Sequence, residues 1–552
     1  MIRSAFLPDL SPIGNQRGVA LLAILAIVIM LTFLGTVAII TSKTEVDISG
    51  VGRTEKKAFY AAEAGVEKVI GLILENYQTH GIPPEPLPSG EMDVNGYTVT
   101  YSTIDQGPAE FQTLNRGAYQ GLYAEVKAFT VEAEAIGGPA NSRVRVTQDI
   151  EDALIPLFQF AVFYEDDLEI APGPNMTLTG RVHTNANMYL QSENHLNIES
   201  YTTAAGSMHH GRHPESGKSD SYGDVFIKDA AEEYENMKNQ DATWLDCEDP
   251  SWVYSSLQRW DGLVEDGAHG ITELYLPVVS EGEPIDLIRR AGGGNNDSYE
   301  NAAGLKFVDG SVYWLNDESN WVDVTSTMIQ DSILTYSTFF NFRETKWISS
   351  YNIDISKLNN SSYLPDNGII YAAHTDNSHG AVRLVNGAEL DGPLTVASLS
   401  PLYTLGDYNS VNKKSAALIS DSYNVLSNAW DDALSPGSLN LRTASNTIVN
   451  ACFMTGNVPS RNNNYSGGLE NLPRFLEKWT DKTFTFRGSM VDLWESQQAS
   501  GIWYYGGYFY TAPNQDWAFD TMYLDSSKLP PGTPMINAVQ RGRWIHHLAS
   551  MD

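Results

Sequence analysis

The stretch VALLAILAIVIMLTFLGTVAII at residues 19–40 decides how this chain begins to fold. It carries no charge, and Thr32 and Thr36 are its only clearly polar side chains. A helix of this length is about 33 Å long, which matches the hydrocarbon core of a bilayer. A cleaved secretory signal has a shorter apolar run, of roughly 7–15 residues. We therefore predict a helix that lies in a membrane or in apolar helix packing.

A short polar leader precedes this helix. It contains Arg3 and Arg17 and ends in Gly18. Positive charges before an apolar segment keep that side in the cytoplasm, so the rest of the chain is expected to be exported. An ordinary signal-anchor helix that holds an exported domain is the simplest alternative.

The segment KAFYAAEAGVEKVIGLILENY at residues 57–77 continues the helix with a different pattern. Its apolar residues recur at spacings of 3, 4, 3 and 4, which is the stripe of an amphipathic helix. We predict one helix from residue 19 to about 77, weakened locally by Gly50, Gly52 and Gly65. Its second half should pack on a domain through Phe59, Ala62, Val66, Val69 and Ile73.

The leader ending in Gly18, the uncharged helix and AFYAAEAGVE at residues 58–67 together resemble the N-terminus of type IV pilin-like proteins. The PilX-type minor pilins and the large K-type pseudopilins of type II secretion are the most similar groups, over about residues 14–75. The resemblance implies that a prepilin peptidase cuts after Gly18 and methylates Val19. The helix would then leave the inner membrane and pack with other pilin-like subunits in a filament.

One position departs from the pattern of the major pilins. Most of them have a glutamate five residues after the cut, where this chain has Ala23. A carboxylate in hydrocarbon is costly unless it is paired, and in the family its partner is the N-terminal amine of a neighbouring subunit. The K-type tip pseudopilins also lack this glutamate. The resemblance therefore implies a position at the tip, or a role in starting assembly.

The charge of the chain is unevenly distributed. Its 552 residues include 35 basic and 68 acidic side chains, a net charge of −33. Residues 1–80 contain seven of each kind, so the whole excess lies in residues 81–552. Nucleic-acid binding is excluded by this balance, because phosphate contacts need a basic surface.

After a Pro/Gly connector at 78–93, alternating polar and apolar residues at 97–101, 123–136 and 142–150 predict a small antiparallel sheet of three or four strands. From residue 158 onward, short β runs end at Gly, Asn and Asp corners. We predict an α+β fold with a large β-rich body, in which a parallel β-solenoid is favoured over a sandwich. DAAEEYENM, from residue 229, is expected to form a short helix. The predicted division is a leader (1–18), a pilin-like helix and sheet (19–155), a β-rich region with a loop-rich insertion (156–345) and a β-rich C-terminal region (346–552).

Several groups of residues could carry chemistry, and each has a simpler structural interpretation. His209, His210 and His213 are expected in an exposed loop rather than at a metal. The acidic residues 165–169 could bind calcium, but they lack the EF-hand spacing, so calcium is left at an unspecified site and no other cofactor is expected. Cys247 and Cys452 could form one long-range disulfide or remain two separate thiols.

Aromatic residues gather at 503–510, with Trp517 nearby. They are interpreted as core or as a subunit interface, with stacking on sugars as the alternative. No nucleophile elbow, P-loop or dinucleotide fingerprint occurs in the sequence. A structural subunit is therefore predicted, with the acidic body capping the filament or meeting an external ligand. The alternative is a membrane-anchored exported β-helix enzyme that acts on polysaccharide.

Overall fold

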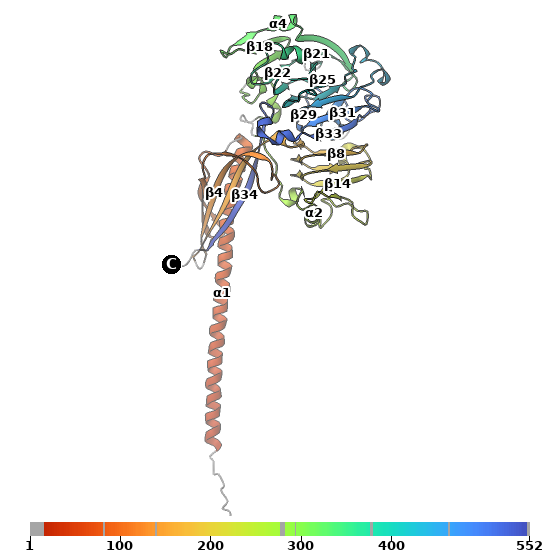
Figure 1. The fold of residues 1–552 in the computed structure, drawn as a ribbon. Helices are drawn as coiled ribbons and strands as arrows, with labels where there is room; N and C mark the ends of the chain where they lie inside the picture. The colour runs from red at the N-terminus through yellow and green to blue at the C-terminus, as the bar shows by residue number, and fades with distance from the viewer. Residues whose placement is uncertain are drawn as a thin grey trace, which may run out of the picture.

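The computed structural model describes residues 16–80, 83–138, 141–276, 282–292, 294–375, 379–461 and 464–548. The leader predicted at 1–18 falls mostly outside these residues, with only its last three positions inside. A long helix, a small sheet beside the upper part of that helix and a large β body make up the molecule (Figure 1).

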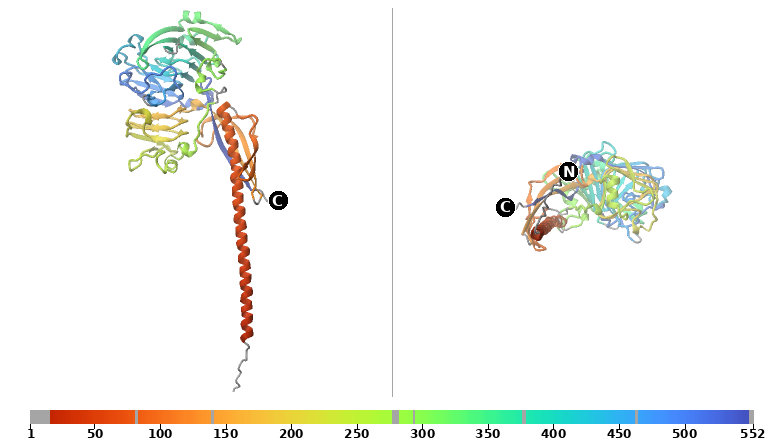
Figure 2. Two further views of the ribbon diagram at one scale, coloured as in Figure 1. Left: turned by 180° about the vertical axis from the view of Figure 1, so that it is seen from behind. Right: turned by 90° about the horizontal axis from the view of Figure 1, so that it is seen from below.

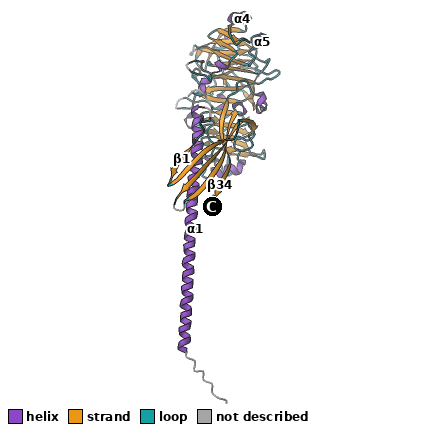
Figure 3. Cartoon of the chain, turned by 90° about the vertical axis from the view of Figure 1, so that its left-hand side faces the viewer, coloured by secondary structure: helices purple, strands orange, loops and turns teal. Residues whose placement is uncertain are grey.

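Helix α1 (Gln16–His80) is continuous over 65 residues. Its sequence contains no proline, and Pro83 and Pro84 follow shortly after its end, as expected for a helix stop. The first half of α1 extends far beyond the rest of the molecule, as the views from behind and from the side show (Figures 2 and 3). The predicted single helix is thus observed, and it begins slightly before residue 19.

The small sheet has six strands in the order β1-β2-β4-β5-β34, with β3 paired to β4. All of its pairs are antiparallel. The expectation of three or four strands was too low, because the C-terminal strand returns from the far end of the chain to pair with β5. The strands are β1 (Ser89–Val94), β2 (Tyr97–Asp105), β3 (Glu110–Thr113), β4 (Tyr123–Gly137), β5 (Ser142–Pro156) and β34 (Met535–Leu548).

The β body begins with short strands that form three sheets, in which all pairs are parallel except the antiparallel pair of β14 and β15. Val162 pairs with Val182, which in turn pairs with Thr202, so neighbouring strands in this sheet are 20 residues apart. The same offset separates the paired strands β7, β10 and β13 in a second sheet. These strands are β6 (Val162–Tyr164), β7 (Leu168–Ile170), β8 (Met176–Leu178), β9 (Val182–Thr184), β10 (Met188–Leu190), β11 (His195–Ile198), β12 (Thr202–Ala204), β13 (Met208–His210), β14 (Asp224–Lys228), β15 (Tyr234–Asn236) and β16 (Val264–Glu265).

The C-terminal part of the body continues the first of these sheets. Strand β32 (Met490–Glu495) pairs in parallel with β6, and the resulting sheet has twelve strands. A six-stranded sheet and a three-stranded sheet complete this part. The remaining strands are β17 (Leu305–Val308), β18 (Ser311–Leu315), β19 (Trp321–Asp323), β20 (Leu334–Asn341), β21 (Lys346–Asp354), β22 (Ile369–Ala373), β23 (Gly380–Val385), β24 (Leu394–Ser398), β25 (Leu402–Leu405), β26 (Ala416–Ser420), β27 (Tyr423–Leu426), β28 (Thr447–Asn450), β29 (Cys452–Asn457), β30 (Arg474–Phe475), β31 (Thr483–Gly488) and β33 (Asn514–Phe519).

Helices in the body are short: α2 (Trp252–Trp260), α3 (Tyr299–Ala302), α4 (Thr325–Gln330) and α5 (Ile355–Asn359). The α+β class with a β-rich body is confirmed. The body contains several sheets, and the sheets that contain β17–β21 include antiparallel pairs. The assignment of the body to a β-solenoid therefore stays a prediction. The helix expected from residue 229 is wrong, because Tyr234–Asn236 pairs with the edge of β14 instead.

Candidate functional site

The first half of α1 is a long, exposed apolar surface. Val19, Phe33 and Ile39 are each 71% exposed, and residues 19–40 are exposed throughout. The hydroxyls of Thr32 and Thr36 donate to backbone carbonyls one turn earlier, at 2.7 and 2.8 Å, so the polar groups here are satisfied within the helix. The described residues contain one helix that is long and apolar enough to cross a membrane. That helix is α1, and residues 19–40 are its apolar part.

The residues assigned to processing and assembly lie at the start of this surface. Gly18 and Val19 fall within the first turns of α1, and Ala23 is an exposed side chain one turn further on. After Arg17, the first charged residue of the helix is Lys43. The uncharged half of α1 therefore presents a continuous face of aliphatic and small side chains.

The second half of α1 has its partner within the chain. Ala62, Val66, Val69 and Ile73 are at most 2% exposed and pack against strands β2, β4 and β5. Phe59 is partly buried at the edge of this core, where its ring contacts Trp544 at 5.6 Å between centroids. The residues expected to pack on a domain thus lie together on the face that meets the sheet.

Gly65 allows the helix to approach the sheet closely. A Cβ at this position would lie 2.8 Å from Val99 Cγ1 and 2.9 Å from Ala133 Cβ, which is too close for real carbon atoms. By contrast, a Cβ at Gly35, Gly50 or Gly52 would meet nothing within 4 Å. Gly65 therefore has a packing role that Gly35, Gly50 and Gly52 lack.

Strand β34 joins the helix to the rest of the sheet. Arg541 on this strand forms a bidentate ion pair with Glu67 of α1, with one N–O distance of 2.9 Å. Sequence reasoning missed this pair and the return of the strand. The signal that could have revealed the strand is the alternation of buried Ile536 and Ala538 with polar neighbours.

The histidines considered as metal ligands are used in packing. His209 and His210 lie on β13, which corrects the expectation of a loop for these two residues. The His210 ring stacks on Trp244 at 3.4 Å, and His213 pairs with Asp167 at 3.0 Å. These two histidines lie in a strand because β13 pairs in parallel with β10. The pairing satisfies backbone hydrogen-bonding groups of β13, whichever side chains the strand carries.

The acidic residues at 165–169 also have protein partners. Glu169 pairs with Arg212 at 3.0 Å, and Glu165 accepts a 2.8 Å hydrogen bond from the Asn185 amide. Burial raises the pKa of Glu165 to about 7. Within the described parts of the chain, no group of three or more His, Cys, Asp or Glu side chains could hold a metal ion.

The two cysteines are free thiols in this structure. Cys247 contacts the His209 ring at 3.2 Å, whereas Cys452 is fully buried in the core of the body. Burial raises the pKa of Cys247 to about 11 and raises the pKa of Cys452 well above its usual value. Of the two arrangements left open by the sequence, the structure contains the separate thiols.

Comparison with known proteins adds little to these observations. No family model matches the sequence, and no curated protein matches it either. Among solved structures, the chain is similar to the competence-associated pilin ComZ from Thermus thermophilus, with 11% identity over 90% of this chain and 98% of that one. The TM-score is 0.30. At this value the likeness carries no argument about fold or function.

Proposed function

We propose that this protein is a minor pilin-like subunit of a type IV pilus or a type II secretion pseudopilus. Its helix would hold it in the inner membrane before assembly and in the filament core afterwards, with the body exported. The role is structural rather than enzymatic. It rests on the sequence resemblance over about residues 14–75 and on the contrast between the two halves of α1.

The exposed half of α1 is the single observation that carries the proposal. An apolar surface of this extent is unfavourable in water and calls for lipid or another protein to cover it. The second half of the same helix is fixed to the small sheet, so a rigid rod links the apolar surface to the body. This is the architecture that helix packing into a filament requires.

Processing by a prepilin peptidase after Gly18 would make Val19 the methylated N-terminus. The small side chain at Ala23 then offers no carboxylate to the N-terminal amine of a neighbouring subunit, a pairing that the major pilins make. A subunit of this kind suits the end of a filament, where one neighbour is missing.

The size of the body also favours the tip. Packed pilins rise by about 10 Å per subunit, comparable to one helix diameter. A compact body of this length has a diameter of roughly 50–60 Å by the scaling of globular chains. Such a body fits at an end but not at every position of the shaft. We also propose that the chain divides into domains after residues 18, 155 and 345. The parallel strands from residue 162 to 228 would form a solenoid.

The test is the substitution Gly18→Ala in the native host, with Gly35→Ala as the matched control. Gly18→Ala should leave the precursor at full length and exclude it from sheared filaments. The control should be processed normally, because residue 35 lies away from the cleavage site and a Cβ there meets nothing within 4 Å in the chain. Mass spectrometry of the mature wild-type protein should find N-methylated Val19.

Two results would contradict the proposal. One is normal processing and assembly of the Gly18→Ala variant. The other is a wild-type precursor that stays intact in the membrane and never copurifies with filaments. The tip position has its own measurement: antibodies against the body should label filament ends, and labelling along the shaft would refute that position alone.

A further inference from the structure

A cavity of about 520 Å³ lies between the first parallel strands of the body and its C-terminal loops. One wall comes from the segment after β7 and from Arg212 and Lys218. The other wall comes from residues 465–471 and 504–515. Its volume is within the range of small-molecule sites, and its walls belong to segments almost 300 residues apart in the chain.

Tyrosine side chains dominate the lining. The Tyr465 and Tyr504 rings are stacked, with centroids 6.3 Å apart, and the Tyr505 ring stands edge-on to Tyr510 at 5.3 Å. Tyr465 and Tyr510 are almost fully buried, whereas Tyr505 is 52% exposed. The aromatic surface that is open to the cavity therefore comes mainly from Tyr504 and Tyr505.

Hydrogen-bonding groups lie between these rings. The Asn471 amide donates to the Gly467 carbonyl at 2.7 Å and accepts from the Tyr510 hydroxyl at 2.6 Å, which fixes its orientation. Two buried atoms of the lining, Arg212 Nε and Gln515 Oε1, have no hydrogen-bond partner among the described residues.

The charges of the lining are largely compensated. Arg212 is paired with Glu169 at 3.0 Å, and the Lys218 ammonium lies over the Tyr504 ring at 4.7 Å from its centroid. Burial raises the pKa of Glu470 to about 8, and this side chain accepts a hydrogen bond from the Ala171 N–H at 2.8 Å. Arg212 and Lys218 are the cations of the lining, and Glu193 and Glu470 are its acidic side chains, so the cavity has no excess of positive charge that would favour a phosphate or another strong anion.

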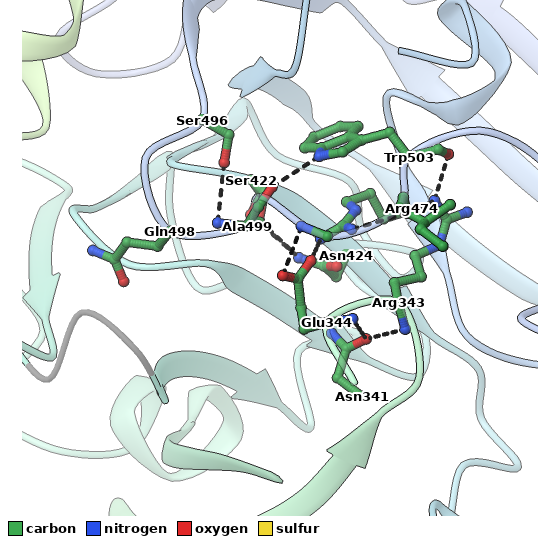
Figure 4. Close-up of polar contacts among 12 residues, drawn as sticks. Asn341, Arg343, Glu344, Ser422, Asn424, Arg474, Ser496, Gln498, Ala499 and Trp503 are labelled. Atoms are coloured by element: carbon green, nitrogen blue, oxygen red, sulfur yellow. Dashed lines mark hydrogen bonds and ion pairs between the residues drawn. The ribbon is translucent and has the colours of Figure 1, made fainter. Parts of the chain in front are cut away.

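The loop that carries the tyrosines is fixed from behind (Figure 4). Arg474 forms a fully buried ion pair with Glu344 at 2.6 Å, and Arg343 donates to the Trp503 carbonyl at 2.6 Å. The Arg343 guanidinium also lies 4.6 Å from the centre of the Tyr510 ring. The aromatic wall is therefore preformed, which lowers the entropic cost of binding. Trp503 itself is buried, as the core interpretation of this cluster expected.

We propose that this cavity binds a neutral oligosaccharide. Sugar rings present C–H faces that pack on tyrosine rings and hydroxyl groups that match the amide, guanidinium and carboxyl groups between them. The compensated charge of the lining selects a neutral sugar over an anionic one. This inference goes beyond the proposed function and does not depend on filament assembly, because the cavity lies entirely in the β body.

The experiment uses the full chain in a detergent without a sugar headgroup. Cellotetraose, chitotetraose and maltotetraose are the probes, and binding is measured by saturation-transfer NMR and by calorimetric titration. At least one probe should bind the wild-type protein, and Tyr504→Ala should weaken its affinity at least 10-fold. The matched control is Tyr508→Ala, because Tyr508 is 64% exposed and lies outside the lining.

A second variant separates loss of the site from loss of the fold. Ala512→Trp places a large side chain at the exposed rim of the cavity and should block binding while the thermal unfolding temperature stays unchanged. The proposal is overturned if none of the three probes binds at millimolar concentration. It is also overturned if Tyr504→Ala and Ala512→Trp bind like the wild type, or if Tyr508→Ala weakens binding as much as they do.

Discussion

The two halves of helix α1 differ in where their partner lies. Both halves are rich in aliphatic residues, yet Ile29 is 53% exposed and Ile73 is fully buried. The second half packs mainly against strands β2, β4 and β5 of its own chain. For the first half, the described residues supply no packing of this kind, and residues 19–40 are exposed throughout.

This contrast separates stability from assembly. Substitutions in the second half act on the core between α1 and the small sheet, so they should change the free energy of unfolding. Substitutions in the first half leave that core intact and should change only what the exposed surface binds. Four predictions test this separation, and in each the effect on unfolding is measured in detergent.

The largest effect is expected from Ile73→Ala. Deleting a buried isoleucine side chain costs about 2–5 kcal/mol of unfolding free energy, because a cavity remains in the core. The same change at Ile29 should alter it by less than about 0.5 kcal/mol. Denaturant unfolding followed by circular dichroism gives both values. Equal destabilisation by the two variants would break the comparison.

Gly65→Ala should have the next largest effect on the free energy of unfolding. The added Cβ would overlap Val99 and Ala133, and overpacking of this kind costs about 1–3 kcal/mol. The control is Gly71→Ala, where a Cβ meets nothing within 4 Å. The control should stabilise the helix by about 0.5–1 kcal/mol, because alanine favours helices more than glycine does. A stabilising Gly65→Ala would show that the helix does not approach the sheet this closely.

Asp152 should make the stability of the small sheet, on which the second half of α1 packs, sensitive to pH. It lies on β5, accepts a hydrogen bond from Asn537 of β34, and burial raises its pKa to about 7. The folded state therefore holds a proton that the unfolded state has released, so this stabilisation is complete below about pH 4 and is lost as the pH rises through about 7.

Asp152→Asn should flatten this dependence. Between pH 5 and pH 8, the wild-type unfolding temperature should fall relative to the variant by about 2–4 °C, because the folded wild type takes on the charge of a buried carboxylate over this range. Thermal scans at the two pH values measure it. Parallel curves for the two proteins would show that Asp152 is ionised throughout.

The smallest effect is expected at the ion pair between Glu67 and Arg541. Glu67→Gln should cost less than about 1 kcal/mol, because both side chains are about half exposed. The loss should disappear at high salt, where surface charges are screened. A salt-independent loss would instead indicate that the glutamate side chain contributes by packing.

Sequence patterns predicted α1 well because the determinants of a helix are local. An uncharged run followed by a 3, 4, 3, 4 spacing requires no knowledge of distant residues. Strands β2, β4 and β5 followed from alternation for the same reason. His209 and His210 were misplaced, because glycines near them suggested a loop while a ladder with β10 held them in a strand.

The candidate sites show the same limit. The helix residues Phe59, Ala62, Val66, Val69 and Ile73 were identified from spacing alone. In contrast, the cavity brings Arg212 together with Tyr465 and Glu470, residues more than 250 positions apart. No pattern of residues close in sequence predicts contacts between segments so far apart. The aromatic cluster at 503–510 was a partial indication of the cavity.

The amino-acid sequence by itself determined the long two-part helix, the charge asymmetry and the β-rich character of the body, because these depend on composition and on short periodicities. Only the tertiary structure decided that the C-terminal strand closes the small sheet and that distant loops enclose the cavity. The physical reason is that strand pairing and cavity walls depend on contacts between distant segments, whose partners are chosen by the packing of the whole chain.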